Sequence, residues 1–207
     1  MHVKICGVRS AADARECVLL GASSIGINFV SSSPRCVSVS TAVAIARAVH
    51  ATGAKAIAVG VVADMTLDAM RALVKDAELD CLQLHGDESH ATLAALLPHA
   101  YKATRIASAD DVARARAYPG EYLLVDGKVP GVLGGSGTTF DWALVRELAT
   151  ERRLTLAGGL DPDNVARAVR DVRPYCVDVA SGVERAGSPG EKDLAKVRAF
   201  IDAARAA

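Results

Sequence analysis

The sequence has no excess of charge of either sign and no long apolar run. Its 24 Lys and Arg side chains equal its 24 Asp and Glu side chains in number, so the formal net charge at pH 7 is +0. A chain without a bulk basic field does not attract nucleic acid or anionic lipid over its surface, and a charged ligand must be met at a local site. No apolar stretch approaches the roughly 20 residues that cross a bilayer. We therefore expect a protein that acts on a small molecule, with no nucleic-acid or membrane partner.

Paired cysteines and a secretory signal are also missing. The five cysteines are an odd number and contain no CxxC pair, which indicates neither a disulfide framework nor a zinc site. The opening residues, MHVKICGVRSAADARE, lack the cationic and then apolar regions of a signal peptide. These absences predict reduced thiols, no bound metal and a cytoplasmic location.

What the chain does have is an alternation of short apolar runs and longer amphipathic segments. Each run is too short for a helix, and most end in Gly or a polar residue. The segment TLDAMRALVKDA at 66–77 is typical of those between them, since its apolar residues fall on one helical face. The eight runs are HVKIC (2–6), SIGINFV (24–30), KAIAVGVV (55–62), CLQLH (81–85), YKATRI (101–106), YLLVD (122–126), LTLAG (154–158) and CVDVAS (176–181).

Capping residues mark several helix ends. Ser10 and Ser108 each begin an S-x-x-D pattern, which is typical of a capping box. Asp161 stands before Pro162, which predicts a helix cap followed by a proline at the first helical position. Gly53 suits the end of another helix.

Strands that alternate with helices predict parallel pairing with right-handed crossovers, and eight such units close into a (β/α)₈ TIM barrel. The alternative is an open five-stranded α/β sheet, which would leave three runs outside the sheet. We favour the barrel, as a single compact domain over residues 1–207, because no linker rich in Pro, Gly or Ser divides the chain.

In such a barrel the active site lies at the carboxyl ends of the strands, and Cys6 and Asp126 each end an apolar run. A thiolate can remove a proton from carbon and a carboxylic acid can protonate a leaving oxygen, so the two form a candidate acid–base pair. The alternative for Cys6 is a structural thiol, because free Cys is among the most buried residue types. That interpretation is the one we apply to the remaining cysteines, which are Cys17, Cys36, Cys81 and Cys176.

Glycine-rich turns follow the last three runs. Such turns expose backbone N–H groups and can bind phosphate without Lys or Arg, although Gly also serves ordinary loop geometry. The loops after the seventh and eighth runs are a recurrent phosphate position in barrels. The candidate phosphate-binding residues are Gly135, Ser136, Gly137, Gly158, Gly159, Ser181 and Gly182.

Three further polar residues have two interpretations each. Arg35, in the loop after the second run, either grips a carboxylate with two parallel hydrogen bonds or is solvated. His85 either orients substrate or satisfies backbone groups at a strand end. Asp178 is either a contact at the barrel mouth or a buried, hydrogen-bonded carboxylate.

Taken together, these segments resemble one family, the phosphoribosylanthranilate isomerases of tryptophan biosynthesis. The resemblance runs through nearly the whole chain in order. The matching segments are KICGVRS (4–10), GINFVSSSPRCVS (26–38), QLHGDE (83–88), LLVDGKVPGVLGGSGTTFDW (123–142), LAGGLDPDNV (156–165) and VDVASGVE (177–184).

The resemblance implies an Amadori rearrangement of N-(5-phosphoribosyl)anthranilate, a small-molecule phosphoribosyl substrate, without metal or organic cofactor. It implies Cys6 as the general base and Asp126 as the general acid. Arg35 would hold the anthranilate carboxylate, and His85 and Asp178 would line the pocket. The family contains both monomers and homodimers, and the sequence pattern does not choose between them.

The sequence departs from the family pattern at two positions. Thr138 stands where the family often has Lys or Gln, and Ala180 where Ser is common.

Two other functions are alternatives. One is another phosphate-binding barrel enzyme that uses a lysine or a metal. No metal spacing is present, and the only lysine near a predicted strand end is Lys4, inside its run. The other is a catalytically silent barrel that binds phosphoribosyl compounds or a protein.

Overall fold

The structure, a computed structural model, describes residues 1–127 and 141–207 and contains a closed barrel of parallel strands in the order β1 to β8. Closure is direct, because β1 pairs with both β2 and β8, so the barrel prediction is confirmed and the open sheet was wrong. Each predicted run overlaps one strand. The strands are β1 His2–Cys6, β2 Ser24–Asn28, β3 Ile57–Val62, β4 Cys81–Leu84, β5 Ala100–Ile106, β6 Tyr122–Gly127, β7 Arg153–Ala157 and β8 Cys176–Val179.

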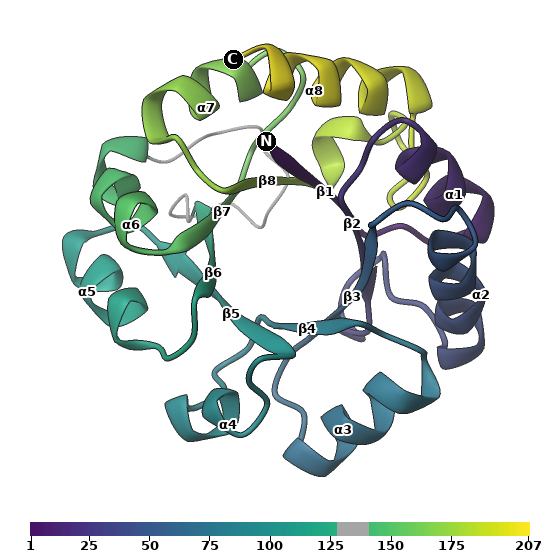
Figure 1. Ribbon diagram of the computed structural model, residues 1–207, viewed down its shortest axis with the longest axis horizontal. Coiled ribbons are helices and arrows are strands. Elements are labelled where there is room, and N and C mark those ends of the chain that lie inside the picture. The colour runs from purple at the N-terminus through teal and green to yellow at the C-terminus, as the bar shows by residue number, and fades with distance from the viewer. Residues whose placement is uncertain (128–140) are drawn as a thin grey trace.

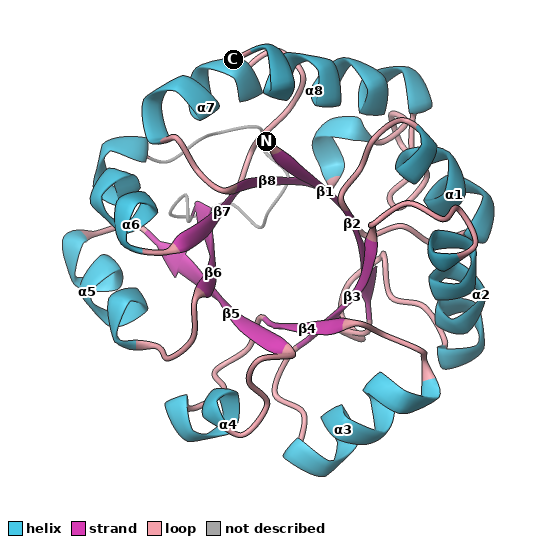
Figure 2. Ribbon diagram, viewed as in Figure 1, coloured by secondary structure: helices cyan, strands magenta, loops and turns pink. Residues whose placement is uncertain are grey.

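Helices form a ring around the barrel (Figures 1 and 2). Within the described residues, one α-helix lies between each pair of successive strands and another follows β8. No helix in this part of the chain is both long and apolar enough to span a membrane. The helices are α1 Ala11–Leu19, α2 Val39–His50, α3 Leu67–Asp76, α4 His90–Ala94, α5 Ala109–Ala117, α6 Arg146–Glu151, α7 Val165–Val172 and α8 Leu194–Ala206, with short 3₁₀ turns at Trp142–Val145 and Ser181–Val183.

The alternation of side chains along each strand separates an apolar layer from a polar barrel interior. Val3 and Ile5 of β1 are fully buried in the main core between barrel and helices. Lys4 and Cys6, at the alternate positions, point to the other face of the strand and therefore into the barrel. The apolar contents of the barrel form a separate small cluster of Ala103, Leu124 and Ala157 with Tyr101 against it.

Ser10, Ser108 and Gly53 mark helix ends as predicted. Ser10 caps α1, Thr66 caps α3, and Ser108 and Asp111 form a reciprocal capping box at α5. Gly53 follows α2 with φ of +69°, a conformation that glycine adopts without a steric penalty.

The helix start predicted at Asp161 was wrong. The α7 helix begins at Val165, after Asn164 at its N-cap. Asp161 Oδ1 instead accepts the N–H groups of Asp163 and Asn164, each at 2.9 Å. The aspartate therefore caps the turn over 162–164 that leads into the helix, which is a local use of the same residue type.

Candidate active site

Cys6 is the last residue of β1, at the carboxyl end of the barrel, and the residue is partly exposed. Its neighbour on β2 is Gly26, which pairs with it in the ladder. A Cβ at Gly26 would lie 2.7 Å from the Sγ of Cys6 and 3.0 Å from the Nζ of Lys4. The absence of a side chain at Gly26 thus lets the thiol and the ammonium group meet beside the strand.

Opposing effects act on the Cys6 thiol. Burial raises its pKa, and the ammonium of Lys4 lowers it through charge and a hydrogen bond, with a smaller lowering from Lys192. The net result is a pKa above the ordinary value. Two lysines favour the thiolate, but burial outweighs them, so the thiol is protonated near pH 7.

Lys4 and Asp178 form a buried ion pair inside the barrel. Lys4 Nζ lies 3.1 Å from Asp178 Oδ1, and the two side chains are 2% and 9% exposed. Burial would lower the pKa of Lys4, but the charges of Asp178 and Cys6 raise it well above the usual value. Of the two interpretations of Asp178, the structure selects the buried, paired carboxylate.

Asp126 lies on β6 at the same end of the barrel, with its side chain 31% exposed. Burial and then the charge of Asp178 raise its pKa to about 6, against opposing effects of Arg105 and Lys4. A Cβ at Gly158 would lie 2.7 Å from Asp126 Oδ1, so this glycine leaves room for the carboxyl group. A carboxyl with a pKa this close to neutrality is a candidate proton donor.

His85 follows β4 directly, and its Nε2 lies 3.7 Å from Asp126 Oδ2. Burial and then the charges of Lys4 and Arg105 lower its pKa to about 4, so the ring is neutral near pH 7. His85 also borders a cavity of about 710 Å³ above β2 to β5, whose wall includes Arg105. That volume is within the range of small-molecule sites.

Arg35 is held by an acidic residue from the far end of the chain. Its Nε and Nη2 donate to the two carboxylate oxygens of Glu184, each at 2.7 Å, and Lys192 Nζ lies 2.9 Å from the same carboxylate. A Cβ at Gly7 would collide with the Cδ of Arg35, so the arginine stem crosses directly over the residue after Cys6. Arg35 is therefore positioned at the mouth and is not a solvated surface residue.

The loops after β7 and β8 pack closely against each other, with glycines at the contact. Gly158 and Gly159 have φ of +93° and +66°, and a Cβ at Gly182 would collide with the carbonyl oxygen of Leu160. Within the described residues, no acceptor receives the N–H of Gly159. Gly135, Ser136 and Gly137, and the departure at Thr138, lie outside the described residues.

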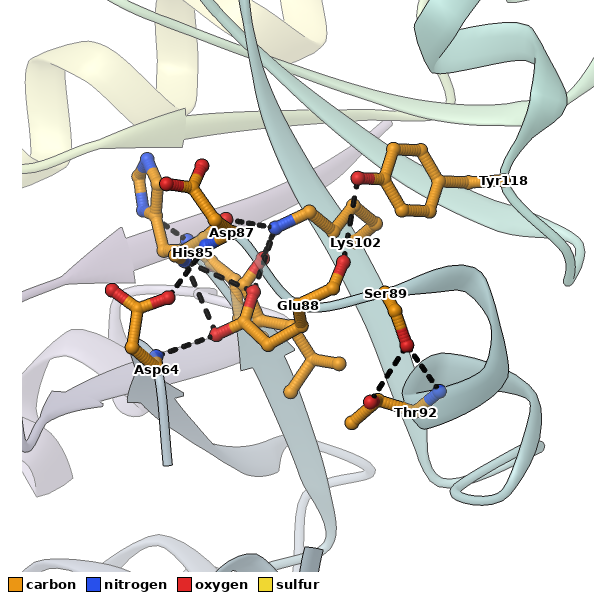
Figure 3. A network of polar contacts seen from close by, with 11 residues as sticks. Asp64, His85, Asp87, Glu88, Ser89, Thr92, Lys102 and Tyr118 are labelled. Carbon is orange, nitrogen blue, oxygen red and sulfur yellow. Dashed lines mark hydrogen bonds and ion pairs between the residues drawn. The ribbon is translucent and has the colours of Figure 1, made fainter. Parts of the chain in front are cut away.

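A buried network supports the loop that carries His85 (Figure 3). Lys102 Nζ pairs with Glu88 Oε2 at 2.7 Å and also donates to the carbonyl oxygens of Leu84 and Gly86. Glu88 Oε1 accepts the backbone N–H of Asp64 at 2.9 Å. The side chains of Lys102 and Glu88 are 3% and 2% exposed, so the pair fixes the backbone on both sides of His85 from within.

Replacing Lys102 with Met should destabilise the fold by about 3 to 5 kcal/mol, because Glu88 would remain buried without a counter-charge. Urea unfolding followed by circular dichroism measures the change. The double variant Lys102→Met/Glu88→Gln is the matched control and should lose clearly less stability than Lys102→Met alone. Equal losses in the two variants would show that the unpaired carboxylate is not the cause.

The sequence analysis did not identify several of the residues that pair with the candidate site. Lys4 was set aside because it lies inside its run, although its spacing of two from Cys6 already placed both side chains on one strand face. Glu184 and Lys102 carried no local signal of their roles. Their partners, Arg35 and Glu88, come from other loops and strands.

The fold and the site together define a class. A closed (β/α)₈ barrel that gathers a thiol, a carboxyl of raised pKa and an imidazole at the carboxyl ends of its strands has the architecture of a barrel enzyme with acid–base groups at its mouth.

Comparison with known proteins narrows the class. The family model of N-(5′-phosphoribosyl)anthranilate isomerase matches residues 3–203. The N-(5′-phosphoribosyl)anthranilate isomerase of Myxococcus xanthus is 43% identical over 99% of this chain and 96% of its own length. The crystal structure of phosphoribosyl anthranilate isomerase from Thermotoga maritima has a TM-score of 0.87 at 32% identity, with both chains fully covered. A crystal structure of the isomerase in complex with reduced 1-(o-carboxyphenylamino)-1-deoxyribulose 5-phosphate has a TM-score of 0.85 at 30% identity, again over the whole of both chains. This chain belongs to the N-(5′-phosphoribosyl)anthranilate isomerase family, and the family resemblance of its motifs is confirmed.

Proposed function

We propose that this chain converts N-(5-phosphoribosyl)anthranilate into 1-(2-carboxyphenylamino)-1-deoxyribulose 5-phosphate, with Asp126 as general acid and Cys6 as general base. One observation supports these two roles: the same two charged residues act on both Cys6 and Asp126. The charges of Lys4 and Asp178 act on both Cys6 and Asp126. The proposed steps need proton transfers only.

The reaction begins at the ribose ring. Asp126 in its protonated form gives its proton to the ring oxygen as the bond from that oxygen to C1′ breaks, which opens the sugar to an iminium. The cationic nitrogen then acidifies the proton on C2′. The Cys6 thiolate removes that proton, an enolamine forms, and its tautomerisation moves a proton to C1′ and leaves a ketone at C2′. Each step is general acid or base catalysis by a positioned side chain.

At rest, Cys6 and Asp126 have protonation states opposite to those that the reaction needs. Near pH 7 a carboxyl with a pKa of about 6 is mostly ionised, and a thiol with a raised pKa is protonated. The reactive pair, thiolate and carboxylic acid, has the same number of protons and the same total charge as the resting pair. Its population therefore does not change with pH between the two pKa values.

This arrangement predicts a flat pH profile. We expect kcat/KM to stay level as the pH rises above about 7 and to fall only as it approaches the raised pKa of the thiol, which steady-state kinetics at constant ionic strength measures. If Cys6 instead rested as thiolate, the required proton on Asp126 would be lost above pH 6. The value of kcat/KM would then drop about tenfold per pH unit, and such a drop would contradict the proposal.

The phosphate would bind where the loops after β7 and β8 meet. Gly158 and Gly159 expose backbone in a left-handed conformation, and Gly182 packs closely against the β7 loop. Such successive N–H groups bind anions without a lysine or arginine side chain. Ser181 begins the short turn on the β8 side and adds a hydroxyl donor.

Arg35 would hold the anthranilate carboxylate. Glu184 occupies its Nε and one Nη2 hydrogen, and this leaves the Nη1 group to donate to a ligand while the guanidinium stays fixed. We expect Arg35→Met to raise KM roughly tenfold or more with a smaller effect on kcat, because the lost contact binds ground state and transition state alike. Initial-rate kinetics measures the two constants, and Arg9→Met, which changes a nearby arginine that contacts Pro189, is the control. An unchanged KM in Arg35→Met would remove this contact from the proposal.

The activity itself is tested with the purified protein. Anthranilate fluorescence should change as N-(5-phosphoribosyl)anthranilate is consumed, and the gene should restore growth without tryptophan to a strain that lacks this step alone. A protein that binds the substrate but neither turns it over nor supports growth would be the silent barrel. Sedimentation of the same sample distinguishes a monomer from a homodimer; monomers of the dimeric isomerase of T. maritima have been described at 31% identity to this chain.

A further inference from the structure

A chain of side-chain hydrogen bonds runs across the barrel interior to His85. The hydroxyl of Tyr101 on β5 donates to Gln83 Oε1 on β4 at 3.1 Å, and Gln83 Nε2 lies 3.1 Å from His85 Nδ1. Gln83 is 1% exposed. The chain therefore connects a buried amide to the imidazole that faces Asp126.

The bond from Tyr101 to Gln83 sets the direction of these hydrogen bonds. The Lys4 ammonium and the Tyr101 hydroxyl are close enough for each to change the pKa of the other. In the structure the Tyr101 hydroxyl donates to Gln83 Oε1, and a nearby cation favours this arrangement because it attracts the hydroxyl oxygen and repels its hydrogen. The amide oxygen accepts it, and the amide N–H₂ must then face His85 Nδ1.

The direction of the chain selects one tautomer of His85. A neutral imidazole has one N–H, and Nδ1 is occupied as an acceptor from Gln83, so the hydrogen is on Nε2. Nε2 and Asp126 Oδ2 are 3.7 Å apart, which is too long for a hydrogen bond between them. An oxygen atom of a ligand placed between the two groups could accept from both.

We propose that Tyr101 and Gln83 are positioning residues that hold neutral His85 in its Nε2–H tautomer, so that Nε2–H donates to the same sugar ring oxygen that Asp126 protonates. This inference rests on the proposed function. A fixed donor aimed at an oxygen that gains negative charge as its bond to C1′ breaks stabilises the transition state.

The opposite tautomer would oppose the reaction. With the hydrogen on Nδ1, the lone pair of His85 Nε2 would face the protonated carboxyl of Asp126 and compete with the sugar for its proton. The Gln83 amide thus prevents His85 from competing for the proton of Asp126. It also makes Nε2–H available as a hydrogen-bond donor.

The tautomer can be read directly by NMR. In protein labelled with ¹⁵N-histidine, long-range ¹H–¹⁵N spectra distinguish Nδ1–H from Nε2–H, and the missing signals of His85→Asn assign the residue. We expect the neutral Nε2–H form in the full chain near pH 7. Gln83→Met keeps the side-chain length but removes the donor, and Tyr101→Phe leaves the amide free to flip, so both variants should show a mixture of tautomers. Thr155→Val, a buried substitution elsewhere in the barrel, should keep the pattern of the unchanged protein.

Kinetics supplies the second readout. We expect Gln83→Met to lower kcat about tenfold with KM changed less than about twofold, because a misdirected ring affects the transition state more than substrate binding. Tyr101→Phe should show a smaller effect of the same kind, and it alone tests the proposal if Gln83→Met fails to fold.

An Nδ1–H tautomer in the unchanged protein, or an unaltered tautomer and kcat in the folded variants, would overturn the inference. Those results would leave the proposed function standing if Asp126→Asn and Cys6→Ala are inactive. Full activity of these two variants would instead refute the proposed roles of Asp126 and Cys6, whatever the NMR spectra show.

Discussion

Cys6→Ala is expected to lower kcat by at least ~10²-fold, the usual cost of losing a general base. The expected physical reason is specific to this position. The thiol stands at the mouth beside the Lys4 ammonium, which favours the thiolate proposed to remove the C2′ proton. The fluorescence assay measures the loss, and the variant should still bind the substrate because the proposed phosphate and carboxylate contacts are untouched.

A second cysteine gives a matched control for this result. Cys81 is the first residue of β4, at the opposite end of its strand and far from the mouth. Burial raises its pKa to about 12, so it has no thiolate near pH 7. Cys81→Ala should keep kcat within about twofold, since it removes the same atom without removing a base. Comparable losses in both variants, or full activity of Cys6→Ala, would exclude the thiol from the mechanism.

Asp126→Asn is the second change with a large expected effect. The amide cannot give a proton to the ring oxygen, so kcat should fall at least ~10²-fold. An assay of ring opening under single-turnover conditions measures this loss at the first chemical step. Asp68→Asn is the control, because it changes a carboxylate that is 98% exposed in the first turn of α3 and takes no part in the proposed reaction. A variant Asp126→Asn with full activity would require another proton donor.

The same substitution should stabilise the protein near pH 7. The pKa of Asp126 is about 6 in the folded chain against an ordinary value of 3.8, so between these values the folded state binds more protons than the unfolded state. Stability therefore falls as the pH rises through this window, and above it the ionised carboxylate destabilises the fold in full. Asn cannot ionise, so Asp126→Asn should be more stable than the unchanged protein at pH 7 by roughly 1 to 3 kcal/mol.

Denaturant unfolding at two pH values tests whether Asp126→Asn stabilises the protein. The stabilising difference should be present at pH 7 and should vanish below about pH 4, where Asp126 is protonated in both states. A variant that is less stable at pH 7 would mean that the carboxylate is favourably paired in the fold. Combined loss of activity and gain of stability is the expected signature of a group kept for chemistry.

The interior of the barrel explains why such groups persist. The charges of Lys4 and Asp178, inside the barrel, change the pKa of both Cys6 and Asp126. The buried pair of Lys4 and Asp178 is neutral as a unit, which limits the desolvation cost of placing either charge inside. Removing one member would therefore disturb the titration of both Cys6 and Asp126.

The sequence by itself determined the barrel and the residues at its mouth. Strands of four to seven residues end within two residues of the ends of the apolar runs, and parallel pairing then brings the carboxyl ends of all strands to one rim. The positions of Cys6 and Asp126 follow from these local facts, because the end of a run and the period of two are both visible in the order of residues. Within the described residues, the family motifs begin on strands and continue past their carboxyl ends, so they lie on the same rim for the same reason.

Only the tertiary structure decided which charges meet. Lys4 and Asp178 are 174 residues apart in the chain, and Arg35 and Glu184 are 149 apart. Such contacts depend on how the closed barrel aligns its first and last strands and on which loops then face each other across the rim. The raised pKa of Asp126, which comes first from burial and then from Asp178, and the fixed guanidinium of Arg35 both depend on the tertiary structure, since an electrostatic environment is set by distance in space and not by distance along the chain.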